Sequence, residues 1–277
     1  MLALSRSART LAEIRALLAL ATPIIIAQLA YTSMGFVDTV MAGRVSARDL
    51  AGVALGNSLW VPVFLLMNGT LLATTAKVAQ RFGAGKEAEN GPLVRQALWL
   101  ALAIGMLCAV LLWNAEPVLR LMGVDAELSA LAMGYLRGVA CGFPATALYQ
   151  VLRCFSDGLG RTRPSMVLGI CGLLLNIPLN YVLIYGKLGL PALGGVGCGW
   201  ATGIVMWCSL LGMLWWVRWA PAYRASGLFQ QFDWPQWPVI RRLLSVGLPI
   251  GVSIFAESSI FSVIALLIGG LGATVVA

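Results

Sequence analysis

The stretch TSMGFVDTVMAG, residues 32–43, places one carboxylate, Asp38, in a segment that is otherwise apolar enough to enter a lipid bilayer. An ionised aspartate at the centre of a membrane helix costs roughly 2.5–3.5 kcal/mol on insertion scales. Because an acid at such a position is costly, its presence predicts that Asp38 has a function. The stretch therefore predicts both a membrane helix and a candidate site on that helix.

The composition of the whole chain agrees with a membrane location. Of the 277 residues, 60% are hydrophobic and 11% are charged, whereas a soluble domain is about 45–50% apolar and about 25% charged. A water-soluble protein of this composition could not cover its surface with polar groups. The sequence therefore predicts an all-α integral membrane protein.

Composition also argues against several other classes. The net charge of +8 comes from short basic clusters between apolar runs, which is typical of membrane topology signals and not of a nucleic-acid interface. The chain has no histidine, which excludes catalysis and metal binding by that residue. HExxH, GxSxG and paired acids on facing helices are also missing from the sequence, so we predict neither an enzyme nor a cofactor.

Apolar runs long enough to cross a bilayer, about 20 residues, recur along the chain. They cover seven segments: residues 16–42, 51–80, 93–113, 129–155, 164–185, 197–219 and 243–272. If the N-terminus is cytoplasmic, fourteen of the nineteen Lys and Arg residues fall on the cytoplasmic side and five on the other. The positive-inside rule therefore predicts a cytoplasmic N-terminus for this multi-pass membrane protein.

A weak internal repeat organises these segments. LLALATPIII (residues 17–26) resembles LLSVGLPIGV (residues 243–252) at an offset of 226, with Pro23 matching Pro249. We therefore expect a six-helix lobe at residues 1–225, a cytoplasmic linker at 226–242, and the first helix of a second lobe at 243–277. On this interpretation the chain is a fragment, one half of a twelve-helix, two-lobe transporter.

Two carboxylates fall well inside the expected spans, Asp38 and Glu257, and both are candidate functional residues. Helical spacing places Gln28, Tyr31 and Gly35 on the same face as Asp38. We expect this stripe to face a cavity or another helix, with Gly35 allowing close approach. Gln28, Tyr31, Asp38 and Glu257 are thus our candidate substrate-binding residues.

The fifth span adds two amides on one face, Asn176 and Asn180, in the stretch LLLNIPLNYV. Their oxygens together with Asp38 would form an all-oxygen site for Na⁺, and the same carboxylate could instead take a proton. The alternative is that the amides only hold helices together, at about 0.6 kcal/mol per hydrogen bond. Asp157, in FSDGLGRTRP, is a helix-end residue or the partner of Arg161 or Arg163 in a gate.

The sequence also resembles a known family. The stretches ATPIIIAQLAYTSMGFVDTVMAG, FSDGLGRTRPSMV, LLLNIPLNYVLIYGKLG and LPIGVSIFAESSIF are similar to the multidrug and toxic compound extrusion (MATE) family, in its NorM-like bacterial branch. The resemblance implies twelve helices in two lobes, a location in the bacterial inner membrane, and export of cationic lipophilic drugs in exchange for Na⁺ or H⁺. It further implies that Asp38, Asn176, Asn180 and Thr202 take the coupling ion, with Glu257 as the acid of the second lobe.

Besides drugs, the expected partner is membrane lipid, and we expect no binding to nucleic acid. The full-length protein is expected to be a monomer. The rival transport function is a flippase for lipid-linked precursors. Such a flippase would carry arginine-rich cavity walls, whereas Lys and Arg here lie near the ends of the expected helices. A structural membrane subunit is a third alternative, but it would not need an acid in each of two corresponding helices.

Overall fold

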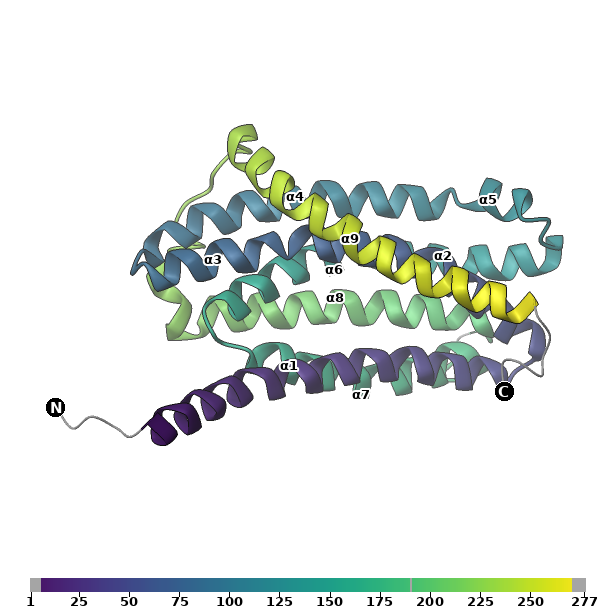
Figure 1. Cartoon of the computed structure of the whole chain (residues 1–277). Helices are drawn as coiled ribbons and strands as arrows, with labels where there is room; N and C mark the ends of the chain where they lie inside the picture. The colour runs from purple at the N-terminus through teal and green to yellow at the C-terminus, as the bar shows by residue number, and fades with distance from the viewer. Residues whose placement is uncertain (1–5, 190, 271–277) are drawn as a thin grey trace.

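The apolar runs form long helices in the computed structural model, which describes residues 6–189 and 191–270 (Figure 1). No β-strand occurs among these residues. The α-helices are α1 (Arg6–Gly43), α2 (Ala47–Leu71), α3 (Ala73–Gly83), α4 (Asn90–Trp113), α5 (Glu116–Leu121), α6 (Ala126–Gly158), α7 (Arg163–Tyr185), α8 (Gly195–Trp219) and α9 (Trp237–Gly270). Two short 3₁₀ helices, η1 (Glu87–Glu89) and η2 (Pro221–Ser226), lie in connections.

Six segments of the described residues are long and apolar enough to cross a membrane, and they correspond to six of the seven predicted spans. The exception, residues 129–155, lies in α6, which carries Arg137 and Arg153 and is surrounded by α2, α4 and α8. Because other helices shield α6 from lipid, it can be less hydrophobic than the outer spans. The predicted all-α membrane fold is therefore confirmed, with α6 as its central helix.

Close approach of α6 and α8 builds the centre of the bundle. A Cβ atom at Gly199 of α8 would lie 2.1 Å from the carbonyl oxygen of Tyr135 in α6. One turn further, a Cβ at Gly203 would lie 2.5 Å from the carbonyl oxygen of Gly138. Small residues at a helix crossing let the backbones touch, and this contact holds in membranes by van der Waals packing.

Several boundaries differ from the sequence prediction, and the first helix already begins at Arg6 rather than at residue 16. The second span is interrupted at Leu72, where α2 ends and α3 begins. Just before the break, Thr70 Oγ1 donates to the carbonyl of Leu66 at 2.8 Å, a bond that competes with regular helix geometry. The last helix begins at Trp237, six residues before the predicted 243, because Pro238 is well tolerated in a first helical turn. Its predicted end at residue 272 lies outside the described residues.

Helix α9 crosses the outside of the bundle obliquely, over α2 (Figure 1). The spacing of Gly247 and Gly251 forms a GxxxG face, and a Cβ at Gly247 would lie 2.0 Å from the carbonyl oxygen of Thr70. A Cβ at Gly69 would lie 2.6 Å from the Cα of Gly251. The first half of α9 is therefore fixed to α2 by backbone-to-backbone packing.

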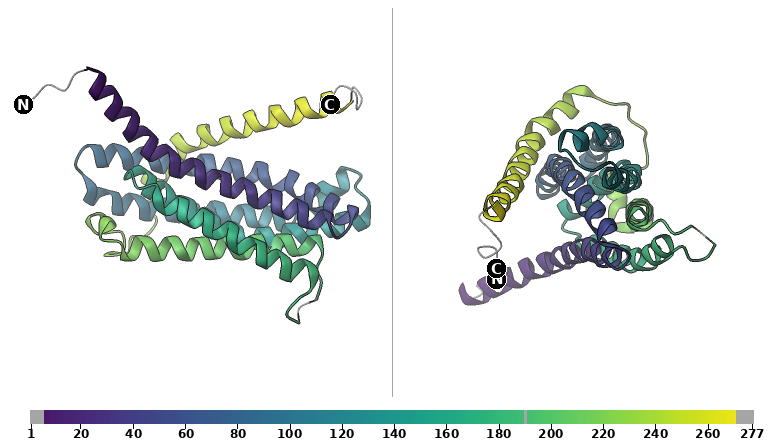
Figure 2. Two further views of the ribbon diagram at one scale, coloured as in Figure 1. Left: turned by 90° about the horizontal axis from the view of Figure 1, so that it is seen from below. Right: turned by 90° about the vertical axis from the view of Figure 1, so that its right-hand side faces the viewer.

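Helices α1 and α7 run side by side on another flank of the bundle, as both views in Figure 2 show. Pro23 and Ala27 of α1 are buried, and a Cβ at Gly169 of α7 would lie 3.3 Å from the Cα of Ala27. Helix α8 packs against α7 from the other side. This arrangement brings one face of α1 toward polar residues of α7 and α8.

Candidate functional site

Asp38 is buried in the described part of the chain, with only 3% of its surface exposed. Because α1 packs against α7, the carboxylate of Asp38 points toward two amide side chains of α7, those of Asn176 and Asn180. Nδ2 of Asn180 donates to Oδ1 of Asp38 at 2.6 Å, and Nδ2 of Asn176 donates to the same oxygen at 3.3 Å. The two amides are themselves joined at 2.9 Å and are fully buried.

A third helix completes the cluster. Oγ1 of Thr202 in α8 donates to Oδ2 of Asp38 at 3.1 Å, and Sγ of Cys198 lies 3.6 Å from the backbone oxygen of Asp38. The structure thus brings Asp38, Asn176, Asn180 and Thr202 together from three helices. We call these four residues the Asp38 cluster.

Three neutral donors converge on one carboxylate, which is the arrangement expected around an anion in a low-dielectric interior. One acceptor is left over: Oδ1 of Asn180 is buried and has no hydrogen-bond partner among the described residues. A buried amide oxygen without a donor is costly, and a cation or a proton on Asp38 could satisfy it after rotation of the amide.

The cluster suits a small monovalent ion better than a transition metal. It offers one carboxylate, two amide groups and one hydroxyl, all hard oxygen ligands. Nowhere in residues 6–189 and 191–270 do three or more His, Cys, Asp or Glu side chains gather as a metal site would require. The donor set therefore fits Na⁺ or a proton.

The rest of the predicted stripe on α1 divides into two environments. Tyr31 is half-buried, and its hydroxyl donates to the hydroxyl of Tyr149 at 2.7 Å. Gln28 and Gly35 are exposed. The expectation that Gly35 permits close helix approach is wrong for this chain, because no described atom outside its own helix lies within 4 Å of a Cβ placed there.

Glu257, the second predicted acid, lies on α9 and is exposed. The Asp38 cluster is formed by α1, α7 and α8, whereas α9 packs on α2, α3 and α4. The structure therefore does not bring Glu257 together with Asp38. The two acids belong to separate regions of the described chain.

A second polar cluster inside the bundle, not predicted from the sequence, is formed by Tyr31, Tyr149, Arg153 and Asp157. Nε of Arg153 lies 3.6 Å from Oδ2 of Asp157, and its guanidinium lies 5.9 Å from the ring centroid of Tyr31. Asp157 therefore pairs with Arg153 one helical turn away. Among the described residues it forms no ion pair with Arg163 or with Arg161, whose guanidinium lies over the ring of Tyr223. The i, i+4 spacing of Arg153 and Asp157 was the available signal.

Comparisons with known proteins identify a family and several relatives of this chain. The MatE family profile matches residues 23–182. Multidrug resistance protein PmpM of Pseudomonas aeruginosa is 67% identical over 277 residues, covering all of this chain and 58% of that protein. Multidrug resistance protein MdtK of Klebsiella pneumoniae subsp. pneumoniae is 49% identical over 261 residues, covering 94% of this chain and 57% of that protein.

Solved structures support the fold. An outward-facing multidrug resistance MATE family transporter of the MOP superfamily superposes with a TM-score of 0.78 at 24% identity, over 88% of this chain and 53% of that one. A MOP superfamily transporter from Pyrococcus furiosus gives a TM-score of 0.77 at 24% identity, again over 88% of this chain and 53% of that one. The chain thus spans somewhat more than half the length of the relatives it matches.

Proposed function

The chain belongs to the MatE family of membrane transporters, and on that premise we propose that the protein containing it is a cation-coupled multidrug efflux antiporter. In this proposal the coupling ion is Na⁺ or H⁺, and the exported substrates are cationic lipophilic drugs. Residues 1–225 form the first lobe, the connection that follows ends where α9 begins at Trp237, and α9, which contains Glu257, opens the second lobe. The N-terminus lies in the cytoplasm of a bacterial cell, and the protein spans the inner membrane as a monomer.

One observation carries the proposal: a membrane carboxylate is enclosed by polar side chains of two other helices. Burial of Asp38 in a span is unfavourable unless it is hydrogen-bonded, and three donors from Asn176, Asn180 and Thr202 meet that need. Purely structural hydrogen bonding between helices would need no charge. The cluster therefore supports a site whose charge changes during the transport cycle.

The proposed exchange follows from competition for that charge. When a cation or proton neutralises Asp38, the three donors lose their anionic acceptor and the amide groups can turn their oxygens toward the ion. The free oxygen of Asn180 is the first such ligand. Because neutral Asp38 no longer attracts a cationic drug, the two cations cannot both be favoured, and their competition drives exchange.

The drug would be held by Gln28 and Tyr31 of α1, attracted by the charge of Asp38, and held by the acid of α9. Gln28 is exposed and Tyr31 is half-buried, about three helical turns and about two helical turns from Asp38. Glu257 is also exposed and would provide the second negative charge. An aromatic ring and a distant carboxylate tolerate many shapes of lipophilic cation, as multidrug export requires.

The test is efflux of ethidium from cells that express the full-length protein, driven by an imposed Na⁺ or H⁺ gradient. Wild type is compared with Asp38→Asn and with Thr39→Val, a matched control on the exposed side of the same helical turn. Efflux that follows one gradient, disappears in Asp38→Asn and persists in Thr39→Val would support the proposal and identify the ion. Gradient-driven efflux that is equal in all three would refute it.

A further inference from the structure

The connection between α8 and α9 is held firmly against the N-terminal turns of α4. Nε of Arg95 contacts Oδ2 of Asp233 at 2.6 Å, and its Nη1 donates to the carbonyls of Gly227 and Leu228 at 3.0 and 3.1 Å. This ion pair is largely shielded, with side-chain exposures of 10% and 24%. One arginine therefore fixes three points of the connection.

Two further side chains of α4 bind the backbone of the same segment. Gln96 donates to the carbonyl of Trp234 at 2.9 Å and accepts from the backbone amide of Gln236 at 2.6 Å. Nε1 of Trp99 donates to the carbonyl of Asp233 at 3.0 Å. Side chains that satisfy backbone groups in this way give the connection a defined shape.

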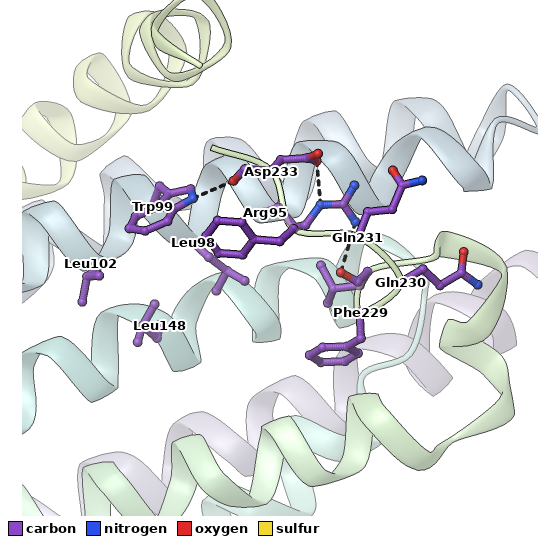
Figure 3. Close-up of a pocket in the computed structure, with 11 residues that line it drawn as sticks. Arg95, Leu98, Trp99, Leu102, Leu148, Phe229, Gln230, Gln231 and Asp233 are labelled. Carbon is purple, nitrogen blue, oxygen red and sulfur yellow. Dashed lines mark hydrogen bonds and ion pairs between the residues drawn. The ribbon is translucent and has the colours of Figure 1, made fainter. Parts of the chain in front are cut away.

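Between this segment, α4 and α6 lies an open groove of about 600 Å³ (Figure 3). Its inner part is apolar, formed by Leu98 and Leu102 of α4 and Leu148 of α6. Figure 3 shows Arg95 and Asp233 above these leucines, with Phe229 and Gln230 at one end. The groove is therefore amphipathic, with leucines at membrane depth and polar groups where the spans end.

Aromatic side chains place the outer edge of the groove at a membrane surface. Phe229, Phe232 and Trp234 are 47%, 69% and 76% exposed. Large aromatic rings exposed beside the end of a membrane span are typical of the lipid headgroup region. The surroundings of the groove are therefore lipid headgroups and the first part of the acyl chains.

The free charge at this edge is positive. Arg218 is exposed, its guanidinium lies 5.9 Å from the ring centroid of Phe229, and it takes part in none of the salt bridges found in the described chain. The groove's own carboxylate, Asp233, is already paired with Arg95. The site thus offers an unpaired cation and no unpaired anion, which favours an anionic ligand over a cationic drug.

We propose that this groove binds an anionic phospholipid from the adjacent leaflet. One acyl chain lies along Leu98, Leu102 and Leu148, and the headgroup phosphate lies near Arg218 beside Phe229. The bound lipid packs against the segment held by Arg95, and so supports the connection that precedes α9. This inference does not depend on what the protein transports or on which ion drives it.

The test uses the full-length protein in nanodiscs that contain phospholipids with brominated acyl chains, which quench nearby tryptophans. The contribution of Trp99, which lines the groove, is the difference between wild type and Trp99→Phe. We expect brominated phosphatidylglycerol to quench Trp99 at roughly one fifth of the mole fraction that brominated phosphatidylcholine needs, as one interfacial arginine would give. Arg218→Gln should bring the two lipids close to parity.

Arg44→Gln is the matched control, because Arg44 is exposed at the opposite end of the bundle. It should leave the preference unchanged. Absence of Trp99 quenching by either lipid, or a preference that survives Arg218→Gln, would overturn the proposal. A parallel count of bound phosphatidylglycerol by native mass spectrometry, on wild type and Arg218→Gln alone, measures the same preference without replacing any tryptophan.

Discussion

The two acids that the sequence places inside membrane spans lie in opposite environments. Asp38 is 3% exposed and accepts hydrogen bonds from two other helices. Glu257 is exposed on α9, even though the first half of that helix packs tightly against α2 through Gly247 and Gly251. A tightly packed helix backbone can therefore still carry an exposed acid, and the buried acid is the one that meets polar partners on neighbouring helices.

Asp38 therefore has polar partners around it within the described chain, whereas Glu257 lies on the surface of α9. The Asp38 cluster is contributed entirely by α1, α7 and α8, so its geometry is present within the described chain. The relatives that match this chain are longer, since it spans 58% of the length of PmpM. Under the proposed function, the environment of Glu257 would include segments like those that the relatives carry beyond the part matched here.

The largest effect is expected at the helix crossing behind the Asp38 cluster. Gly199→Leu would force a side chain into the carbonyl of Tyr135, now 2.1 Å from the Cβ position. Such overpacking costs about 1–3 kcal/mol or more, and it would also move Thr202 away from Asp38. We expect loss of folded protein, measured as monodisperse yield in detergent. Gly35→Ala, which meets only open space, should keep the wild-type yield.

The amides of α7 should differ from each other. Asn180→Leu removes the 2.6 Å bond to Asp38 and the bond to Asn176, so it should lower the unfolding free energy by about 1.5–3 kcal/mol. Asn176→Leu also removes the bond between the two amides, but its own bond to the carboxylate is the weaker one at 3.3 Å, so it should cost less. Denaturant unfolding in detergent gives both values. The reverse order would contradict the geometry of the cluster.

A smaller effect is expected for Thr202. Thr202→Val keeps the shape of the side chain and removes one neutral donor, at 3.1 Å from Oδ2 of Asp38. The expected loss is about 0.5–1.5 kcal/mol in the same assay. Thr202→Ser, which keeps the hydroxyl, should recover most of it, and failure to do so would mean that the methyl group rather than the hydrogen bond matters.

The smallest effect is expected at Glu257, the exposed acid of α9. Glu257→Gln changes an exposed side chain and should alter the unfolding free energy of this chain by no more than about 0.5 kcal/mol. The measurement is again denaturant unfolding in detergent, with Asn180→Leu measured in parallel for comparison. A loss as large as that of Asn180→Leu would remove the distinction between the two acids.

Much of the fold could be predicted because apolar runs in a membrane have few alternatives to helices. The Asp38 cluster was predictable in part, since Asn176 and Asn180 share a helix face and polar groups inside spans seek one another. The Arg153–Asp157 pair was missed because Arg153 was counted as a topology signal near a helix end. The exposure of Gly35 could not be foreseen, because spacing defines a face of a helix but not what covers it.

The central claim is that Asp38 takes the coupling cation, and displacement of that cation by drug tests it most directly. Purified full-length protein is titrated with ethidium while released protons are followed by a pH indicator and released Na⁺ by a radioactive tracer. The account predicts release of one of these ions on drug binding by wild type, no release by Asp38→Asn, and retained release by Thr39→Val. Undiminished release by Asp38→Asn would contradict it.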